Sequence, residues 1–227
     1  MKMKVIILAA GEGTRLRPLT LTTPKPLIEV AGKPIIERII ESLPDDITEA
    51  VLVVKHLEEK IIAHLGNSFS NRKITFVTQG ETKGTFGALL SARDELISEK
   101  KFLVLNGDDL NSKEELEKFM INERAWGLQK MVMPNYYSMQ VANGYVEGFK
   151  PQDESEKANG ALIATGVYLL DPQIFNHPGV IVSGGEYGLP QTILEQKFTL
   201  PIRAIATEKW LPINSLSDLE RAKNMLG

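Results

Sequence analysis

The chain has 227 residues, of which 43% are apolar and 24% are charged, and its formal net charge is −3. These values are typical of a globular protein with one large domain, and they lack the strong positive charge of a nucleic-acid or acidic-membrane binder. The absence of cysteine excludes disulfides and thiolate metal sites. No signal peptide and no apolar run of ~20 residues is visible, so we expect a cytoplasmic protein without membrane contact.

The first half of the chain alternates apolar runs with helical patterns. Strands are expected over residues 5–10, 50–54, 74–78 and 101–105, and helices over 35–43, 57–65 and 85–97. This alternation predicts a largely parallel sheet with helices on both faces. Between the first strand and the first helix, residues 11–26 form a long loop that contains three prolines, and long ordered loops are often functional.

The second half is richer in strand patterns. Strands are expected over residues 136–141, 145–149 and 162–170, a polar loop over 151–159, and a closing helix over 216–226 with Ser215 or Ser217 as its cap. No linker separates this half from the first. We therefore expect a single domain over residues 1–227.

The loop after the first strand opens with Gly11-Glu12-Gly13-Thr14-Arg15. Glycines let backbone amides approach and face a phosphate, although a tight turn would need them equally. A dinucleotide fingerprint would require a third glycine where Leu16 stands and a helix that Pro18 prevents. The P-loop pattern is also absent, because no Gly-Lys-Ser/Thr follows at the right spacing.

Three stretches together carry a family resemblance: Gly11 to Thr20, Pro24-Lys25-Pro26-Leu27, and Val30-Ala31-Gly32-Lys33-Pro34. They resemble the signature of the sugar-phosphate nucleotidyltransferases, the NDP-sugar pyrophosphorylases, including glucose-1-phosphate thymidylyl- and uridylyltransferases and the uridylyltransferase domain for N-acetylglucosamine 1-phosphate. Weaker matches continue to Leu226. The resemblance implies a Rossmann-like three-layer α/β fold with a mixed, mainly parallel sheet. It also implies a reaction of a nucleoside triphosphate with a sugar 1-phosphate and Mg²⁺, giving a nucleotide sugar and pyrophosphate.

The chemistry of that reaction explains the residue types in the loop. A phosphate oxygen that is already ionised needs no general base, so the obstacle is to bring two polyanions together. By resemblance, Arg15 and Lys25 are catalytic groups at the phosphates. Further residues are implied to hold the nucleotide: Ala10, Gly11, Gly13 and Thr14.

Metal ligands are implied at two places in the sequence. Asp108 and Asp109 follow the strand expected over 101–105, where α/β sheets bind ligands. The family's metal aspartate follows a glycine, which indicates Asp108 as a catalytic metal ligand, with Asp109 as the alternate. Pro212 stands where many members have an aspartate, and Asn214 matches the second ligand of members that act on N-acetylglucosamine 1-phosphate. Loop or helix-cap roles are the alternatives for these residues.

The base and the sugar are implied less sharply. Gln79, Gly84 and Thr85 resemble the segment that reads the base, which favours UTP or dTTP, although the same segment also resembles guanylyltransferases. The resemblance further implies a group that contacts the sugar phosphate: Glu147, Lys150, Thr165 and Gly166.

Two other functions remain open. Phe149 and Ala164 stand where many members have polar sugar contacts, which would suit a cytidylyltransferase for phosphocholine or a similar phosphate. Pro212 would suit a nucleotide-binding regulator without catalysis. A homo-oligomer also stays open, and no nucleic-acid partner is expected.

Overall fold

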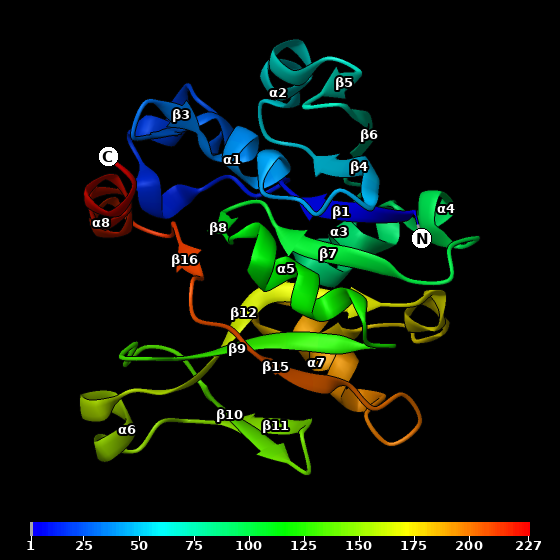
Figure 1. Ribbon diagram of the computed structural model, residues 1–227, viewed down its shortest axis with the longest axis vertical. Coiled ribbons are helices and arrows are strands. Elements are labelled where there is room, and N and C mark those ends of the chain that lie inside the picture. Colours follow the sequence, from blue (N-terminus) through cyan, green and yellow to red (C-terminus); the bar gives the residue numbers. More distant parts are fainter. Residues whose placement is uncertain (1) are drawn as a thin grey trace.

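The computed structural model describes residues 2–227, and a mixed ten-stranded sheet runs through it (Figure 1). Its strands in chain order are β1 Met3–Leu8, β4 Ile47–Val54, β5 Ser68–Phe69, β6 Arg72–Thr78, β7 Phe102–Asn106, β9 Ala125–Met131, β10 Ser138–Ala142, β11 Tyr145–Lys150, β12 Ala161–Leu170 and β15 Arg203–Ala206. Their spatial order is β10-β11-β15-β9-β12-β7-β1-β4-β6-β5. Within this sheet, β5, β11 and β12 run against the other seven strands.

Helices cover both faces of the sheet. The first core, with Val5 and Ile7 of β1, packs under α1 Ile35–Glu41, α2 Glu58–Leu65, α5 Lys113–Met120 and α8 Leu216–Leu226. The second core, with Ile6, packs under α3 Gly84–Ser91, α4 Arg93–Leu96 and α7 Leu189–Glu195. Adjacent residues of β1 thus enter opposite cores, as the alternation of side chains along a strand requires. The predicted Rossmann-like α/β fold with a mixed, mainly parallel sheet is confirmed.

Each expected strand and helix of the first half overlaps an element of the structure, although β1 ends at Leu8 and not at residue 10. The helix expected over 85–97 is two helices, α3 and α4, that meet at Ala92, whose backbone is not helical (φ −94°, ψ 10°). In the part of the chain that the structure describes, no helix has both the length and the apolar character needed to cross a membrane.

Several elements of the second half have no counterpart among the expected ones, the longest being α5, β9, α7 and β15. In β9 a glycine interrupts the apolar pattern, and packing explains it: a Cβ on Gly127 would lie 2.3 Å from Thr165 Oγ1 of β12. The polar loop expected over 151–159 is wrong, because it contains α6 Glu154–Asn159. Asp153 and Glu156 form a capping box at its N-terminus, and none of its residues is buried, so no apolar periodicity could reveal this helix.

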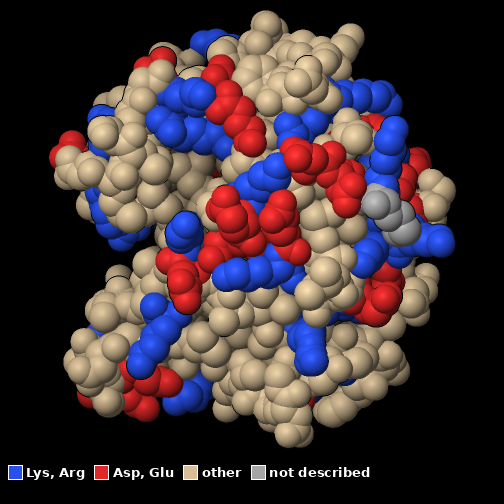
Figure 2. All heavy atoms as spheres, in the orientation of Figure 1, with Lys and Arg blue, Asp and Glu red and all other residues tan. Residues whose placement is uncertain are grey.

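The carboxyl ends of the central parallel strands define the edge that matters for function. Because β1 pairs in parallel with β4 and β7, the loops that follow β1 and β7 start at the same edge of the sheet. In Figure 1 this edge lies on the left, between α8 and α6. Figure 2 shows the surface hollowed there, between the parts of the molecule that carry these two helices.

Candidate active site

The segment after β1 folds into three short 3-10 helices: η1 Thr14–Leu16, η2 Leu19–Leu21 and η3 Lys25–Leu27. Gly13 has a φ of +63°, and a Cβ there would lie 2.9 Å from Thr20 Cγ2 and 3.1 Å from Lys25 Cβ. The Thr20 hydroxyl also donates to the Gly13 carbonyl at 2.9 Å. This glycine therefore lets η3 fold back and places Lys25 beside the start of the loop.

The other predicted nucleotide-binding residues of this loop lie around that turn. Gly11 is exposed, and no other heavy atom lies within 4 Å of the position of a Cβ built on it. Thr14 is exposed on η1, while Ala10 is half-buried at the end of β1. The backbone at Gly11 is thus open to close approach by a ligand, which is the property that a phosphate loop needs.

Four residues predicted from distant segments meet at this edge. The Lys25 ammonium contacts Asp108 Oδ2 and donates to Asn214 Oδ1 at 3.4 Å. Arg15 Nη2 donates to the same Asn214 oxygen at 3.0 Å. Lys25 is only 8% exposed, whereas Arg15 is exposed and Asp108 is half-buried. The cluster is thus built around a nearly buried ammonium with a guanidinium at its rim.

Short strand pairing brings Asn214 beside Asp108. β16 Leu211–Pro212 pairs antiparallel with β8 Asp109–Leu110, and the Ile213 amide donates to the Asp108 carbonyl at 2.9 Å. Asn214 then precedes α8. Its backbone N–H donates to Asp218 Oδ2 at 3.0 Å, and Ser215 caps the helix, as expected. Pro212 is buried in this pairing. The proline that stands in place of the family's aspartate is therefore part of the short strand that pairs with β8.

Of the two adjacent aspartates, Asp109 lies beneath the cluster. Its side chain is 2% exposed, and Asn106 Nδ2 donates to its Oδ2 at 3.1 Å. Burial, followed by the charge of Asp108, raises the pKa of Asp109 to about 8. Asp108 is the more exposed of the two aspartates, and its choice over Asp109 as the metal ligand stays a prediction.

Sequence reasoning missed Tyr136 as part of this cluster. Asn214 Nδ2 donates to the Tyr136 hydroxyl at 3.2 Å, and burial raises the pKa of this hydroxyl while the nearby Arg15 cation opposes the increase. The expected strand over 136–141 included Tyr136, but β10 starts at Ser138 and Tyr136 lies in the preceding turn. Nothing in the sequence around Tyr136 indicates this contact, because the partner is 78 residues away.

The predicted base-reading residues form a tight turn. Gln79 Nε2 donates to the carbonyls of Thr82 and Gly84, at 2.9 and 3.3 Å. Gly84 has a φ of +87°, and a Cβ on it would lie 2.5 Å from the Tyr187 carbonyl. The Thr85 hydroxyl accepts from the Leu189 amide at 2.9 Å. These contacts hold the turn against the segment before α7, and the part these residues play at a base stays a prediction.

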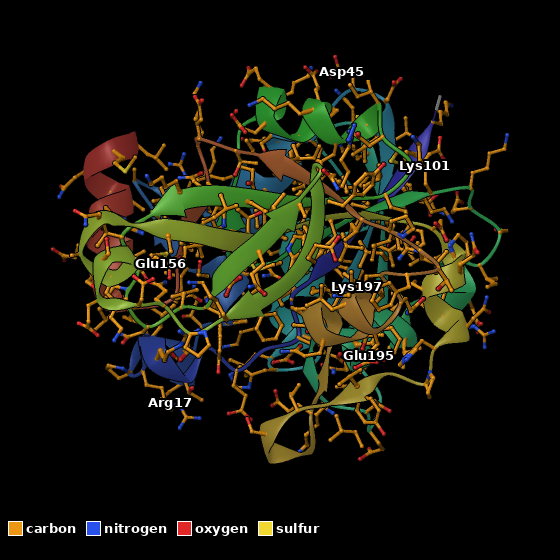
Figure 3. All side chains as sticks on the ribbon, turned by 90° about the horizontal axis from the view of Figure 1, so that it is seen from below. Arg17, Asp45, Lys101, Glu156, Glu195 and Lys197 are labelled. Atoms are coloured by element: carbon orange, nitrogen blue, oxygen red, sulfur yellow. The ribbon has the colours of Figure 1, made fainter. Side chains whose placement is uncertain are left out.

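Glu147 and Lys150, predicted at the sugar phosphate, each have a partner of opposite charge. Lys150 Nζ lies 3.0 Å from Glu156 Oε2 of α6, and its hydrogen bond to Glu156 raises the pKa of Lys150. Glu147 Oε2 lies 3.6 Å from Lys197 Nζ. In Figures 1 and 3, α6 with Glu156 lies at the same end of the molecule as the loop that carries Arg17.

Thr165 and Gly166, predicted as sugar contacts, are packed inside the sheet, and their part at a sugar stays a prediction. The Thr165 side chain is buried, and its hydroxyl donates to the Gly127 carbonyl at 2.9 Å. A Cβ on Gly166 would lie 2.1 Å from both Asn106 Nδ2 and Asp109 Oδ2. The structure therefore gives both positions a packing role: Thr165 joins β12 to β9, and Gly166 makes room for Asp109.

The cluster fits a magnesium ion. The Asp108 carboxylate and the Asn214 amide oxygen are hard oxygen donors, and Mg²⁺ commonly takes one or two protein oxygens and completes its shell with phosphate and water. The Lys25 nitrogen contacts both oxygens, so this position already holds a positive charge. Within residues 2–227 no group of three or more His, Cys, Asp or Glu side chains could hold a metal ion.

Comparisons with known proteins establish the class. The model of the nucleotidyl transferase family matches residues 4–183, so the chain belongs to this family. The bifunctional protein GlmU of Methanocaldococcus jannaschii is 39% identical over 173 residues, and the match covers 76% of this chain but only 41% of that protein. The UTP–glucose-1-phosphate uridylyltransferase AglF of Haloferax volcanii is 31% identical over 241 residues, 99% of this chain and 96% of that protein.

The fold has close parallels among solved structures. A UDP-glucose pyrophosphorylase complexed with UDP-glucose superimposes with a TM-score of 0.83 at 20% identity, over 99% of this chain and 98% of the other. At this identity the likeness concerns the fold.

Proposed function

We propose that the chain joins a nucleoside triphosphate to a sugar 1-phosphate. A phosphate oxygen of the sugar 1-phosphate attacks the α-phosphorus in line. The bond from the α-phosphorus to the oxygen that bridges to the β-phosphate breaks, and pyrophosphate leaves with that bonding pair. The observation that carries the proposal is the meeting of Arg15, Lys25, Asp108 and Asn214 at one edge of the sheet. Family membership and the nearly full-length match to a uridylyltransferase support it.

Each residue of the cluster stabilises charge at a different part of the substrates. Mg²⁺, held by Asp108 and Asn214, would supply positive charge at the phosphates when bound. Lys25, released from Asp108, neutralises charge where the bonds are exchanged. Arg15, at the exposed rim, clamps the triphosphate and the departing pyrophosphate. Since the attacking oxygen is already ionised, preorganised positive charge is the main contribution that the protein has to make.

UTP or dTTP is the proposed nucleotide and a sugar 1-phosphate the proposed acceptor. The open backbone at Gly11, together with Ala10, Gly13 and Thr14, suits contacts to the nucleotide, and the turn from Gln79 to Thr85 suits the base. Lys150 and Glu147 are proposed for the sugar phosphate. Their ion pairs with Glu156 and Lys197 would then be exchanged for contacts to the substrate.

One observation favours a second candidate acceptor. The rings of Tyr137 and Phe149 form an edge-to-face pair with centroids 5.1 Å apart, and Tyr137 is 57% exposed. Aromatic rings bind quaternary ammonium groups through cation–π attraction. A phosphocholine acceptor with CTP is therefore the second candidate.

Pyrophosphate release tests both candidates. The chain is incubated with Mg²⁺ and each of ATP, GTP, CTP, UTP and dTTP, in combination with several sugar 1-phosphates and phosphocholine. We expect release with UTP or dTTP and a sugar 1-phosphate. Release only with CTP and phosphocholine would favour the second candidate. No release, with nucleotide binding still visible as a thermal shift, would contradict both and favour a regulator that only binds nucleotides.

A further inference from the structure

We propose that Tyr136 is a positioning residue for the magnesium site: its hydroxyl fixes the orientation of the Asn214 amide. The inference deepens the proposed function and rests on it. Tyr136 precedes β10 and belongs to none of the segments that carry the family resemblance. Its effect is exerted through Asn214, whose oxygen has to face the cation.

The hydrogen bonds around Asn214 distinguish the two ends of its amide. Nδ2 donates to the Tyr136 hydroxyl at 3.2 Å. On the opposite side, Oδ1 accepts from Arg15 Nη2 at 3.0 Å and from Lys25 Nζ at 3.4 Å. The amide is therefore oriented by a hydroxyl on its nitrogen side and by two cations on its oxygen side.

This orientation matters because an amide ligand is asymmetric. A rotation of the Asn214 side chain by half a turn would present N–H donors to the metal in place of the oxygen. In the proposed reaction, Arg15 and Lys25 move to the phosphates, and the Tyr136 hydroxyl is the contact that remains to hold the nitrogen side. A carboxylate at the same position would have two equivalent oxygens and would need no such support.

The backbone of the turn that carries Tyr136 is held in place by a buried glutamine. Gln152 Nε2 donates to the carbonyls of Tyr136 and Met133, at 2.8 and 2.9 Å. Gln152 is 7% exposed and lies two residues beyond Lys150, so the turn is tied to the segment that follows β11.

A double-mutant cycle tests this role. Binding of Mn²⁺ alone, as a probe for Mg²⁺, is followed by the loss of the free-ion electron paramagnetic resonance signal in the unaltered chain, Tyr136→Phe, Asn214→Asp and the double variant. Tyr145→Phe is the control, since Tyr145 lies on β11 and packs under Arg203. Circular dichroism melting of each variant shows whether the fold is retained.

We expect Tyr136→Phe to weaken Mn²⁺ binding about tenfold, the usual range for the loss of a group that orients a metal ligand. In the Asn214→Asp background the same change should leave Mn²⁺ binding unaltered, because either oxygen of the carboxylate can face the ion. Tyr145→Phe should bind Mn²⁺ as the unaltered chain does.

Three results would overturn the proposal: an equal loss in both backgrounds, no loss in either, or no Mn²⁺ binding by the unaltered chain. An equal loss would show that Tyr136 acts through the general packing of the turn. The expected Mn²⁺ pattern in a chain that releases no pyrophosphate with any substrate pair would refute the proposed function and leave the positioning role standing.

Discussion

The two ends of the candidate site differ in how their charges are used. At the ends of β1 and β7, Lys25 contacts both Asp108 and Asn214, and Arg15 shares the same asparagine oxygen. At β11, Lys150 and Glu147 point to separate partners, Glu156 and Lys197. The first end is a converging group built around the nearly buried Lys25, and the second is two separate ion pairs at the partly exposed surface.

This difference has an energetic meaning. An exposed ion pair is worth ~0–1 kcal/mol, so a substrate can displace the partners of Lys150 and Glu147 with little loss. Charges in a shielded cluster interact more strongly and are already placed before the substrate arrives. Changes at the first end should therefore affect the rate, and changes at the second end should affect mainly the concentration of acceptor that is needed.

Lys25→Ala should give the largest effect. Loss of this preplaced positive charge should lower kcat by about 10²–10³-fold, the range for the removal of one group that stabilises developing charge. Initial rates of pyrophosphate release measure it. Lys33→Ala is the matched control, since Lys33 forms an ion pair with the exposed Glu41. A near-normal kcat in Lys25→Ala would exclude the catalytic role of Lys25.

Gly166→Ala should destabilise the fold beneath the cluster. The added methyl would lie 2.1 Å from Asn106 Nδ2 and Asp109 Oδ2, and overpacking of this kind typically costs about 1–3 kcal/mol. Urea denaturation measures the free energy of unfolding. Gly80→Ala is the control, because the nearest atom to its added methyl is 4.0 Å away. Equal stability of both variants would show that Gly166 is not needed to accommodate Asp109.

Lys150→Ala should raise the KM for the sugar 1-phosphate about tenfold, the effect of one lost hydrogen bond to a charged group. The KM for the nucleotide and the value of kcat should change little. Lys157→Ala on α6, which removes the exposed pair with Glu154, is the control. A large fall in kcat would show that the two ends are not separate in function.

Glu156→Gln should have the smallest effect and the opposite sign. Without the charge of its partner, Lys150 is freer to meet a phosphate, and the KM for the sugar 1-phosphate should fall less than about fivefold, given the small energy of an exposed pair. The same titration of acceptor measures it. A higher KM would indicate that Glu156 holds Lys150 in its binding position.

The sequence predicted more of the first end than of the second. The apolar runs marked β1, β4, β6 and β7. A long signature indicated Arg15 and Lys25, and separate, shorter resemblances indicated Asp108 and Asn214, which the structure brings together with them. Tyr136 could not be predicted, because its role depends on a contact between distant segments. The exposed helix α6 has no buried face, so its sequence lacks the periodicity that reveals a helix. The Thr165 side chain packs inside the sheet because Gly127 on the neighbouring strand leaves room for it, and this contact too joins distant segments.

The most direct test of the central claim uses the substrate pair that responds in the panel of triphosphates and acceptors. Its rate of pyrophosphate release is measured against Mg²⁺ concentration for the unaltered chain and for Asp108→Ala. If the cluster at the ends of β1 and β7 is the reaction centre, the unaltered chain requires Mg²⁺, and Asp108→Ala stays near background at every concentration. A normal maximal rate in Asp108→Ala, or an unaltered chain that is fully active without Mg²⁺, would contradict the account.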